Sequence, residues 1–273
     1  ANRARQSAAL YGERGAVYQQ RESGAIYNLY AGRTIPVFAY QEMCNYYLNY
    51  DFSIVLTLML CLYGIIGTFV SERETQMDML LLVSPGGGRK TALAKILAAT
   101  LFLLLTSLWF SLLDLIGFAA SFQTLEGLTL PVFAIPNFAE VSVNLSIFQY
   151  VLLSAALKCA GTWVIGMLWL LVSMFWKNAL LPFVISLSLC MALTVSGAAR
   201  AYSNFFWTKV LNPYSLLTNR VLLGKTEFVN LGGFPVLTWQ AAIWFALIAG
   251  LVLVAAIYFL SAENCHRCVR RAK

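Results

Sequence analysis

Five long apolar stretches dominate this chain, and each is long enough to cross a lipid bilayer as a helix. A hydrocarbon core about 30 Å thick requires roughly 20 mainly apolar residues. Only 11% of all residues are charged, whereas a soluble domain carries about 25% and needs them to cover its surface. The sequence therefore predicts an all-α integral membrane protein whose five transmembrane helices span about 52–70, 96–122, 147–175, 179–196 and 240–260.

The distribution of polar and basic residues divides the chain further. Residues 1–50 are polar, aromatic and basic, residues 51–261 form the predicted transmembrane domain, and residues 262–273 form a basic tail. Basic residues gather in the loop 71–95 and in the tail, whereas the loop 123–146 contains no lysine or arginine. Because cytoplasmic loops carry an excess of lysine and arginine, we expect the loop 71–95 and the tail in the cytoplasm and the first segment outside the cell.

The start of the chain leads to one further expectation. It begins with Ala1 rather than methionine, and no apolar run typical of a signal peptide follows. A basic segment outside the cell must be carried across the membrane. We therefore expect a missing N-terminal span upstream, which would bring the total to six.

The charged insert at 71–95 separates the first two spans and reads SERETQMDMLLLVSPGGGRKTALAK. Met77, Leu80 and Leu81 recur at the three- and four-residue steps of a helix and can share one face. Pro85 and the three glycines after it end such a helix. We expect a short amphipathic helix on the cytoplasmic side, which lies on the lipid surface or docks into a partner protein. The plainer alternative is a solvated loop with one helical turn.

The residues of this insert resemble the first cytoplasmic loop of type-2 ABC exporter permeases. In that family an ERExGTxExLLxxP run is followed by a basic residue and by a lysine that opens the next span. This chain is similar at residues 72–74 and 81–85 and at Arg89 and Lys95. It departs from the pattern at Gln76, where the family usually has glycine, and its glycine turn is slightly longer.

The resemblance extends toward the end of the chain. Residues 212–217 read NPYSLL and are similar to the segment before the last span in a six-span branch of this family. In that branch the segment often forms short helices that re-enter the outer leaflet. The mixed apolar and polar content of residues 205–223 permits such helices here.

The resemblance implies a transport function. The chain would be the permease subunit of an ABC exporter in a bacterial cell membrane, surrounded by lipid, and would move a lipid, a peptide or a hydrophobic drug-like substrate outward. Cytoplasmic ABC ATPase subunits would bind ATP and Mg²⁺, and a second permease subunit, identical or homologous, would complete a dimer. The ATPase-coupling interface implied by the resemblance comprises Glu72, Arg73, Glu74, Met77, Leu80, Leu81, Pro85 and Arg89.

Other chemical motifs give little support to catalysis in this chain. The run GGGRKT at residues 86–91 is too short for the phosphate-binding pattern GxxxxGK[ST]. His266, the single histidine, stands between Cys265 and Cys268, which gives three crowded ligands where a structural zinc site needs four. We expect reduced thiols there, with lipidation as the alternative. We therefore predict no enzyme activity, no cofactor and no metal in this chain, and the dispersed basic residues argue against nucleic acid as a partner.

Two charged residues, Asp114 and Lys158, lie inside predicted spans. Their depths below the outer ends of their helices differ by only about 5 Å at 1.5 Å per residue. An unpaired charge at such a depth costs at least about 2.5–3.5 kcal/mol. We expect an ion pair that fixes the register of the two helices. The alternatives are groups that line a substrate path or a coupling-ion site, and snorkelling of Lys158 alone.

Two other functions are compatible with these features. An ion-coupled secondary transporter would use Asp114 and Lys158 and would need no ATPase, but it predicts an internal repeat of spans that the sequence does not show. A non-transporting membrane sensor subunit would use residues 1–50 for recognition. A membrane enzyme is disfavoured because a set of catalytic groups is lacking.

Overall fold

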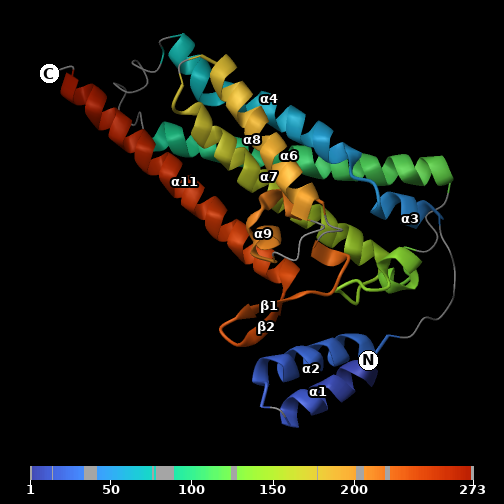
Figure 1. Cartoon of the computed structure of the whole chain (residues 1–273). Helices are drawn as coiled ribbons and strands as arrows, with labels where there is room; N and C mark the ends of the chain where they lie inside the picture. The colour runs from blue at the N-terminus through green and yellow to red at the C-terminus, as the bar shows by residue number, and fades with distance from the viewer. Residues whose placement is uncertain are drawn as a thin grey trace.

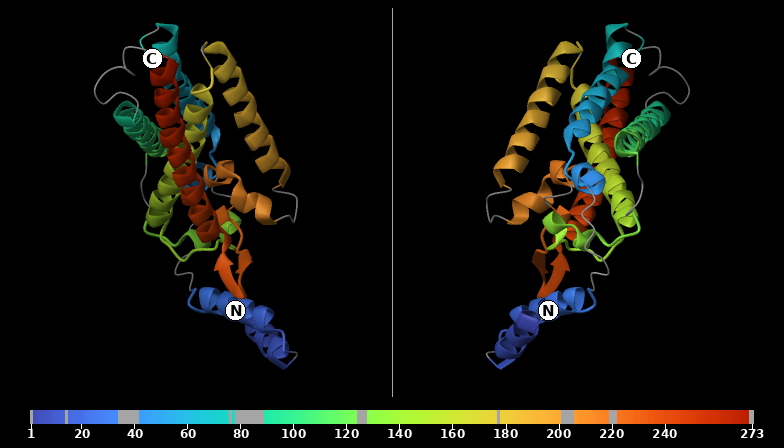
Figure 2. Two further views of the ribbon diagram at one scale, coloured as in Figure 1. Left: turned by 90° about the vertical axis from the view of Figure 1, so that its left-hand side faces the viewer. Right: turned by 90° about the vertical axis from the view of Figure 1, so that its right-hand side faces the viewer.

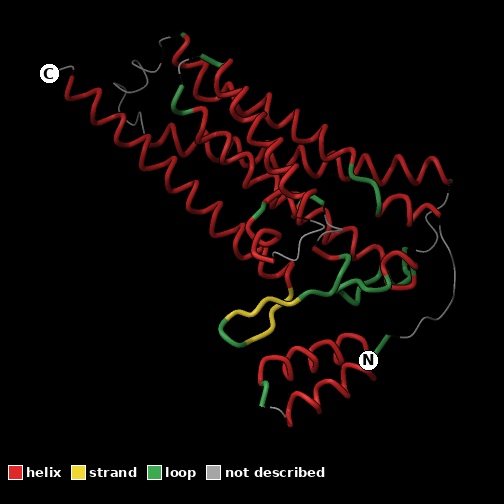
Figure 3. Tube along the Cα trace, in the orientation of Figure 1, coloured by secondary structure: helices red, strands yellow, loops and turns green. Residues whose placement is uncertain are grey.

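The computed structural model describes residues 2–13, 15–33, 42–75, 77, 89–123, 128–176, 178–200, 206–218 and 222–271. Most of this part of the chain is helical (Figure 1, Figure 3). The α-helices are α1 (Asn2–Glu13), α2 (Val17–Ala31), α3 (Glu42–Leu48), α4 (Phe52–Glu74), α6 (Arg89–Phe122), α7 (Ile147–Ser173), α8 (Leu180–Arg200), α9 (Phe206–Leu211) and α11 (Thr238–Arg271). The shorter elements are the 3₁₀ turns η1 (Val132–Ala134), η2 (Pro136–Phe138) and η3 (Pro213–Leu216) and the strands β1 (Phe228–Leu231) and β2 (Phe234–Leu237).

Four helices in the described part of the chain are long and apolar enough to cross a membrane. They are α4, α6, α7 and the part of α11 from Thr238 to Ser261. The apolar part of α8, Leu180–Ser196, is shorter. The coarse prediction of a helical multi-pass membrane protein is therefore confirmed, with four membrane-length helices and one shorter apolar helix at the five predicted positions.

The helices extend beyond the predicted spans at several ends. α4 continues to Glu74 and α6 begins at Arg89, so the predicted loop 71–95 is helical at both of its ends. α11 continues to Arg271, which makes residues 262–271 of the predicted tail helical. Apolar residues mark where lipid contact ends, whereas a helix continues as long as its residues favour it. Glutamate, arginine and lysine are good helix formers and do not stop it.

One loop contains β-structure, which the all-α prediction did not include. The strands β1 and β2 pair in antiparallel orientation, with Leu231 opposite Phe234. Gly232 and Gly233 between them have φ angles of 63° and 87°. Two consecutive residues with positive φ are typical of the tightest hairpin turn, and glycine adopts this conformation without steric cost. The Asn230 side chain also accepts a 2.8 Å hydrogen bond from the Gly233 amide.

The helix α7 packs against α4, α6, α8 and α11 (Figure 1). Its Trp169 and Leu170 side chains are fully buried. Gly166 allows α6 to approach closely, because a Cβ atom at this position would overlap the Leu103 side chain. In their most apolar 18-residue windows, α4 and α7 bury 56% and 50% of the residues, whereas α6 and α11 bury 22% and 17%. The apolar faces of α6 and α11 therefore form much of the outer surface of this helical bundle.

The helices α1 and α2, together called the N-terminal hairpin, lie beyond the β-strands at one end of the molecule (Figure 2). Arg21 of α2 donates a 3.0 Å hydrogen bond to the Gly233 carbonyl, and its guanidinium lies 4.7 Å from the centre of the Phe234 ring. The Tyr30 hydroxyl lies 2.7 Å from Thr226 Oγ1. These contacts join the N-terminal hairpin to the loop that precedes α11.

Arg33, just after α2, joins the same hairpin to the loop before α7. Its Nε donates to Asn144 Oδ1 at 2.7 Å. Its two Nη atoms donate to the carbonyls of Ala139, at 3.0 Å, and Val141, at 2.6 Å. The guanidinium also lies 5.0 Å from the centre of the Phe133 ring. The predicted extracellular segment thus contains a folded helical unit that contacts the loops of the membrane domain.

We expect Arg33→Ala to loosen the N-terminal hairpin. A hydrogen bond to a charged group contributes about 1.5–3 kcal/mol, and water replaces part of what this solvent-accessible set loses, so the local opening free energy should fall by about 2 kcal/mol. Amide hydrogen exchange in α2 should become roughly 30-fold faster, since 1.4 kcal/mol corresponds to a factor of about ten. Arg3→Ala is the control, because the Arg3 side chain is exposed on α1. Equal exchange rates in the two variants would contradict the assigned role of Arg33.

Candidate functional site

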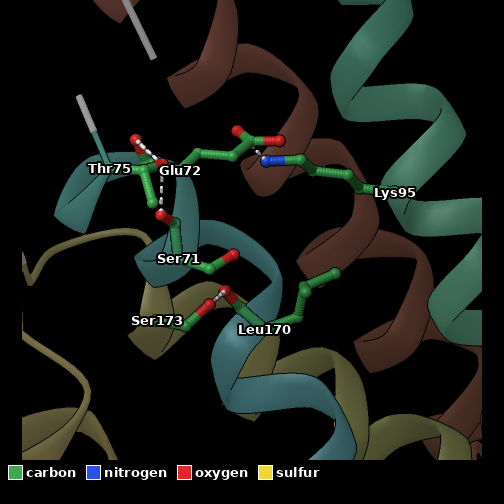
Figure 4. A network of polar contacts seen from close by, with 6 residues as sticks. All are labelled: Ser71, Glu72, Thr75, Lys95, Leu170 and Ser173. Carbon is green, nitrogen blue, oxygen red and sulfur yellow. Dashed lines mark hydrogen bonds and ion pairs between the residues drawn. The ribbon is translucent and has the colours of Figure 1, made fainter. Parts of the chain in front are cut away.

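The charged end of α4 forms the first candidate site. Glu72 makes a hydrogen-bonded ion pair with Lys95 of α6, and both side chains are partly buried (Figure 4). The Lys95 ammonium also lies 4.0 Å from the centre of the Phe69 ring. A cation over an aromatic face gains about 0.5–2 kcal/mol. The pair therefore holds the last turn of α4 against the first turns of α6.

The two residues after Glu72 contact the turn between α7 and α8. Arg73 donates a 3.2 Å hydrogen bond from Nη1 to the Trp176 carbonyl. The Glu74 carboxylate accepts a 3.0 Å hydrogen bond from the Ala179 amide. Glu72, Arg73, Glu74 and Lys95 are together called the α4-end network. It connects α4, α6 and the α7–α8 turn.

Local side-chain hydrogen bonds lie in the last turns of α4 and α7, next to this network. Thr75 Oγ1 donates to the Ser71 carbonyl at 2.8 Å and so supports the last turn of α4. Ser173, the last residue of α7, is fully buried and donates to the Leu170 carbonyl at 2.7 Å. Figure 4 shows these two contacts around the Glu72–Lys95 pair. The hydroxyl groups of Thr75 and Ser173 thus bond to backbone carbonyls of the helices whose ends lie at the network.

The structure describes part of the predicted ATPase-coupling interface. Glu72, Arg73 and Glu74 make contacts within the chain, which the sequence did not predict. The Met77 side chain is 56% exposed. Arg89 is the first residue of α6, and the structure does not describe its side chain. Leu80, Leu81 and Pro85 lie outside the described residues. The predicted amphipathic helix therefore remains a prediction.

The second candidate site contains the two charges inside the spans. Asp114 of α6 and Lys158 of α7 line one cavity of about 20 Å³, called the Asp114 cavity. The Ser53 hydroxyl of α4 donates a 2.5 Å hydrogen bond to Asp114. The expected ion pair is not formed, because no nitrogen–oxygen distance of 4.0 Å or less joins these two described side chains. The predicted similar depth of the two residues agrees with their lining of one cavity, whereas the prediction of direct pairing was wrong.

Aromatic and acidic residues complete the Asp114 cavity. Tyr47 of α3 and Tyr50 and Asp51, which precede α4, line it as well. Burial and then the charge of Asp114 raise the pKa of Tyr47 to about 12. A tyrosine phenol is protonated at neutral pH in any case, so it can serve as a donor in the cavity. The cavity lies at the end of the bundle where α3 joins α4.

A group of hydroxyl side chains that was not predicted from the sequence lies next to this cavity. A second cavity of about 10 Å³, called the hydroxyl cavity, is lined in its polar part by Lys158, Ser53, Thr57, Ser107, Ser111 and Thr162. These residues form three pairs four positions apart, on α4, α6 and α7, and such pairs share a helix face. The spacing was readable in the sequence. It attracts little notice because serine and threonine hydroxyls commonly bond to their own helix.

The ion pair in the α4-end network is best tested with a double-mutant cycle. We expect Glu72→Gln and Lys95→Met to destabilise the detergent-solubilised protein singly, because each leaves the other charge partly buried. The double variant should recover about 1–2 kcal/mol relative to the sum of the single effects. Thermal unfolding followed by fluorescence measures this coupling. The control cycle combines Glu72→Gln with Lys209→Met, since Lys209 pairs instead with Glu227. Additive losses in both cycles would contradict the pair.

Comparison of the chain with protein-family models, with curated proteins and with solved structures finds no match. The family resemblance therefore rests on the sequence alone, at the loop 71–95 and at residues 212–217.

Proposed function

We propose that this chain is the permease subunit of an ATP-driven ABC exporter in the cell membrane, with the loop 71–95 and the C-terminal tail in the cytoplasm. The α4-end network carries this proposal. It gathers four charged residues that connect three parts of the bundle, and three of them, Glu72, Arg73 and Glu74, belong to the segment 72–89 that the resemblance implies for ATPase docking. A coupling element needs such a connection between a docking surface and several membrane helices.

The network suggests how a force on this segment would reach the helices. The chain continues from the docking segment into α4 on one side and α6 on the other. The Glu72–Lys95 pair would make these two helix ends move together, and Arg73 and Glu74 would move the α7–α8 turn with them. Closure of two ATPase subunits on ATP could then tilt the helices. α4 alone is 23 residues long, or about 35 Å at 1.5 Å per residue.

The exposed faces of the bundle support a second permease subunit. Only 22% and 17% of the residues in the most apolar windows of α6 and α11 are buried. Such surfaces are stable against lipid and against another membrane protein. A homologous or identical partner that packs on one of these faces would enclose a path for a lipid, a peptide or a hydrophobic drug-like substrate. The remaining faces would stay in contact with lipid.

The Asp114 cavity favours one alternative function. A carboxylate and an ammonium on neighbouring membrane helices are the groups that an ion-coupled secondary transporter uses. Such a transporter would work without an ATPase. The N-terminal hairpin would suit a non-transporting sensor subunit, which would bind a ligand without moving it.

The exporter proposal predicts that an ATP-hydrolysing subunit co-purifies with the intact chain from mild detergent. A double variant, Met77→Asp with Leu81→Asp, places charge on the predicted docking face and should reduce the recovered ATPase activity at least about tenfold, since one buried charge costs several kcal/mol. Val17→Asp is the matched control, because Val17 is 55% exposed on the N-terminal hairpin, far along the chain from the loop. If no ATPase activity accompanies the unaltered chain, the exporter proposal is wrong.

A further inference from the structure

The Asp114 cavity and the hydroxyl cavity adjoin at one side chain. Lys158 lines both of them. Ser53, which donates to Asp114, also lines the hydroxyl cavity. Polar groups therefore line the two cavities from Asp51, just before α4, past Asp114 and Lys158 to Thr162.

Most hydroxyl protons around Lys158 are already used in hydrogen bonds. Thr57 donates to the Ser53 carbonyl at 2.8 Å, and Ser111 donates to the Ser107 carbonyl at 2.9 Å. The oxygen atoms of these donors keep lone pairs that can accept further hydrogen bonds. The hydroxyl cavity therefore suits an occupant that donates hydrogen bonds, such as an ammonium group or water.

Thr162 gives an independent indication that the hydroxyl cavity holds water. Its side chain is 0% exposed, and its Oγ1 has no hydrogen-bond partner among the described residues. A buried polar group without a partner costs about 1–3 kcal/mol. A cavity of about 10 Å³ has room for roughly one water molecule, and such water normally makes two to four hydrogen bonds. One water can satisfy Thr162 and reach the neighbouring oxygen atoms.

The charged and titratable groups around Lys158 come from three directions. Asp114 faces it from α6, Tyr47, Tyr50 and Asp51 from the α3–α4 region, and Tyr150 from α7 itself. The described side chains of α11, from Thr238 to Ser261, include no charged group. The local balance is thus one basic group and two carboxylates, without direct contact between Asp114 and Lys158.

We propose that Asp114 and Lys158 form a proton-binding site in which water in the two cavities links the carboxylate to the ammonium group. Uptake of one proton from the adjoining aqueous phase converts the Asp114 carboxylate into a carboxylic acid, and Lys158 keeps its ammonium proton. Release of that proton restores the carboxylate, and no electron is transferred. The Ser53 hydroxyl orients Asp114 as a positioning residue.

A proton fits this site better than a metal cation. Lys158 already provides a positive charge between the two cavities. Each cavity holds about one or two waters by volume, too few to complete the oxygen shell of a hydrated cation. Leu103 and Ile165, about one helical turn along α6 and α7 from Ser107 and Thr162, are apolar and fully buried. Exchange would therefore occur through the end of the bundle where α3 joins α4. This proposal does not depend on the exporter proposal.

The test is infrared spectroscopy of the full chain in lipid nanodiscs during a pH titration. We expect one protonated-carboxyl stretching band that titrates between about pH 4 and 9 and is absent in Asp114→Asn. Lys158→Met should move the titration midpoint upward by about one pH unit, because loss of a nearby positive charge favours the neutral acid. Lys209→Met is the matched control and should leave the midpoint unchanged, since Lys209 pairs with Glu227. Ser53→Ala, a small substitution, should shift the band frequency because a donor is lost.

Three results would overturn the proposal. The first is that neither the unaltered chain nor the Ser53→Ala variant shows a titrating carboxyl band that Asp114→Asn removes. The second is an equal shift in Lys158→Met and Lys209→Met, which would indicate a general effect of net charge. The third is a midpoint that moves when sodium chloride replaces choline chloride at constant ionic strength, which would identify a sodium ion as the ligand.

Discussion

The burial of α7 is the constraint on which the other membrane helices depend. This helix contacts α4, α6, α8 and α11 and carries the fully buried Trp169 and Leu170. Lipid tails are as apolar as these side chains, so the hydrophobic effect does not bring such helices together within a membrane. Close packing does, and small residues permit it. Gly166 under the Leu103 side chain is one such position, and it brings α6 near enough to α7 for polar groups on both to share a cavity.

Polar contacts then determine how the packed helices are arranged at their ends. At one end the α4-end network connects three parts of the bundle through side chains and backbone groups. At the opposite end of α4, the carboxylate of Asp114 is held by Ser53. α4 thus makes polar contacts with α6 near both of its ends, with mainly apolar residues between them. A relative rotation of these two helices would have to break one set of contacts or the other.

The sequence predicted the features that lipid imposes and missed those that depend on helix orientation. Long apolar runs located the membrane helices because few other structures are stable in lipid. The depths of Asp114 and Lys158 were also readable, since each residue adds a fixed rise. Their direct pairing was predicted wrongly because depth does not determine the direction in which a side chain leaves its helix, and Ser53 was closer to Asp114. Similarly, Glu72 and Lys95 stand at opposite ends of one insert, and only the folded chain shows that they meet.

The junction between β2 and α11 has a mechanical consequence. β2 ends at Leu237 and α11 begins at Thr238, with no residue between them. Thr238 is anchored twice to the Glu227 carbonyl, through its amide at 3.1 Å and its hydroxyl at 2.8 Å. The β-hairpin and the 34-residue helix are therefore joined rigidly, and Arg21 joins the N-terminal hairpin to the same strands. α11 is about 50 Å long, so it acts as a lever: a tilt of about 5° at the hairpin would displace its far end by about 4 Å. A ligand that binds the N-terminal hairpin could therefore move the far end of α11 without contacting the apolar helices.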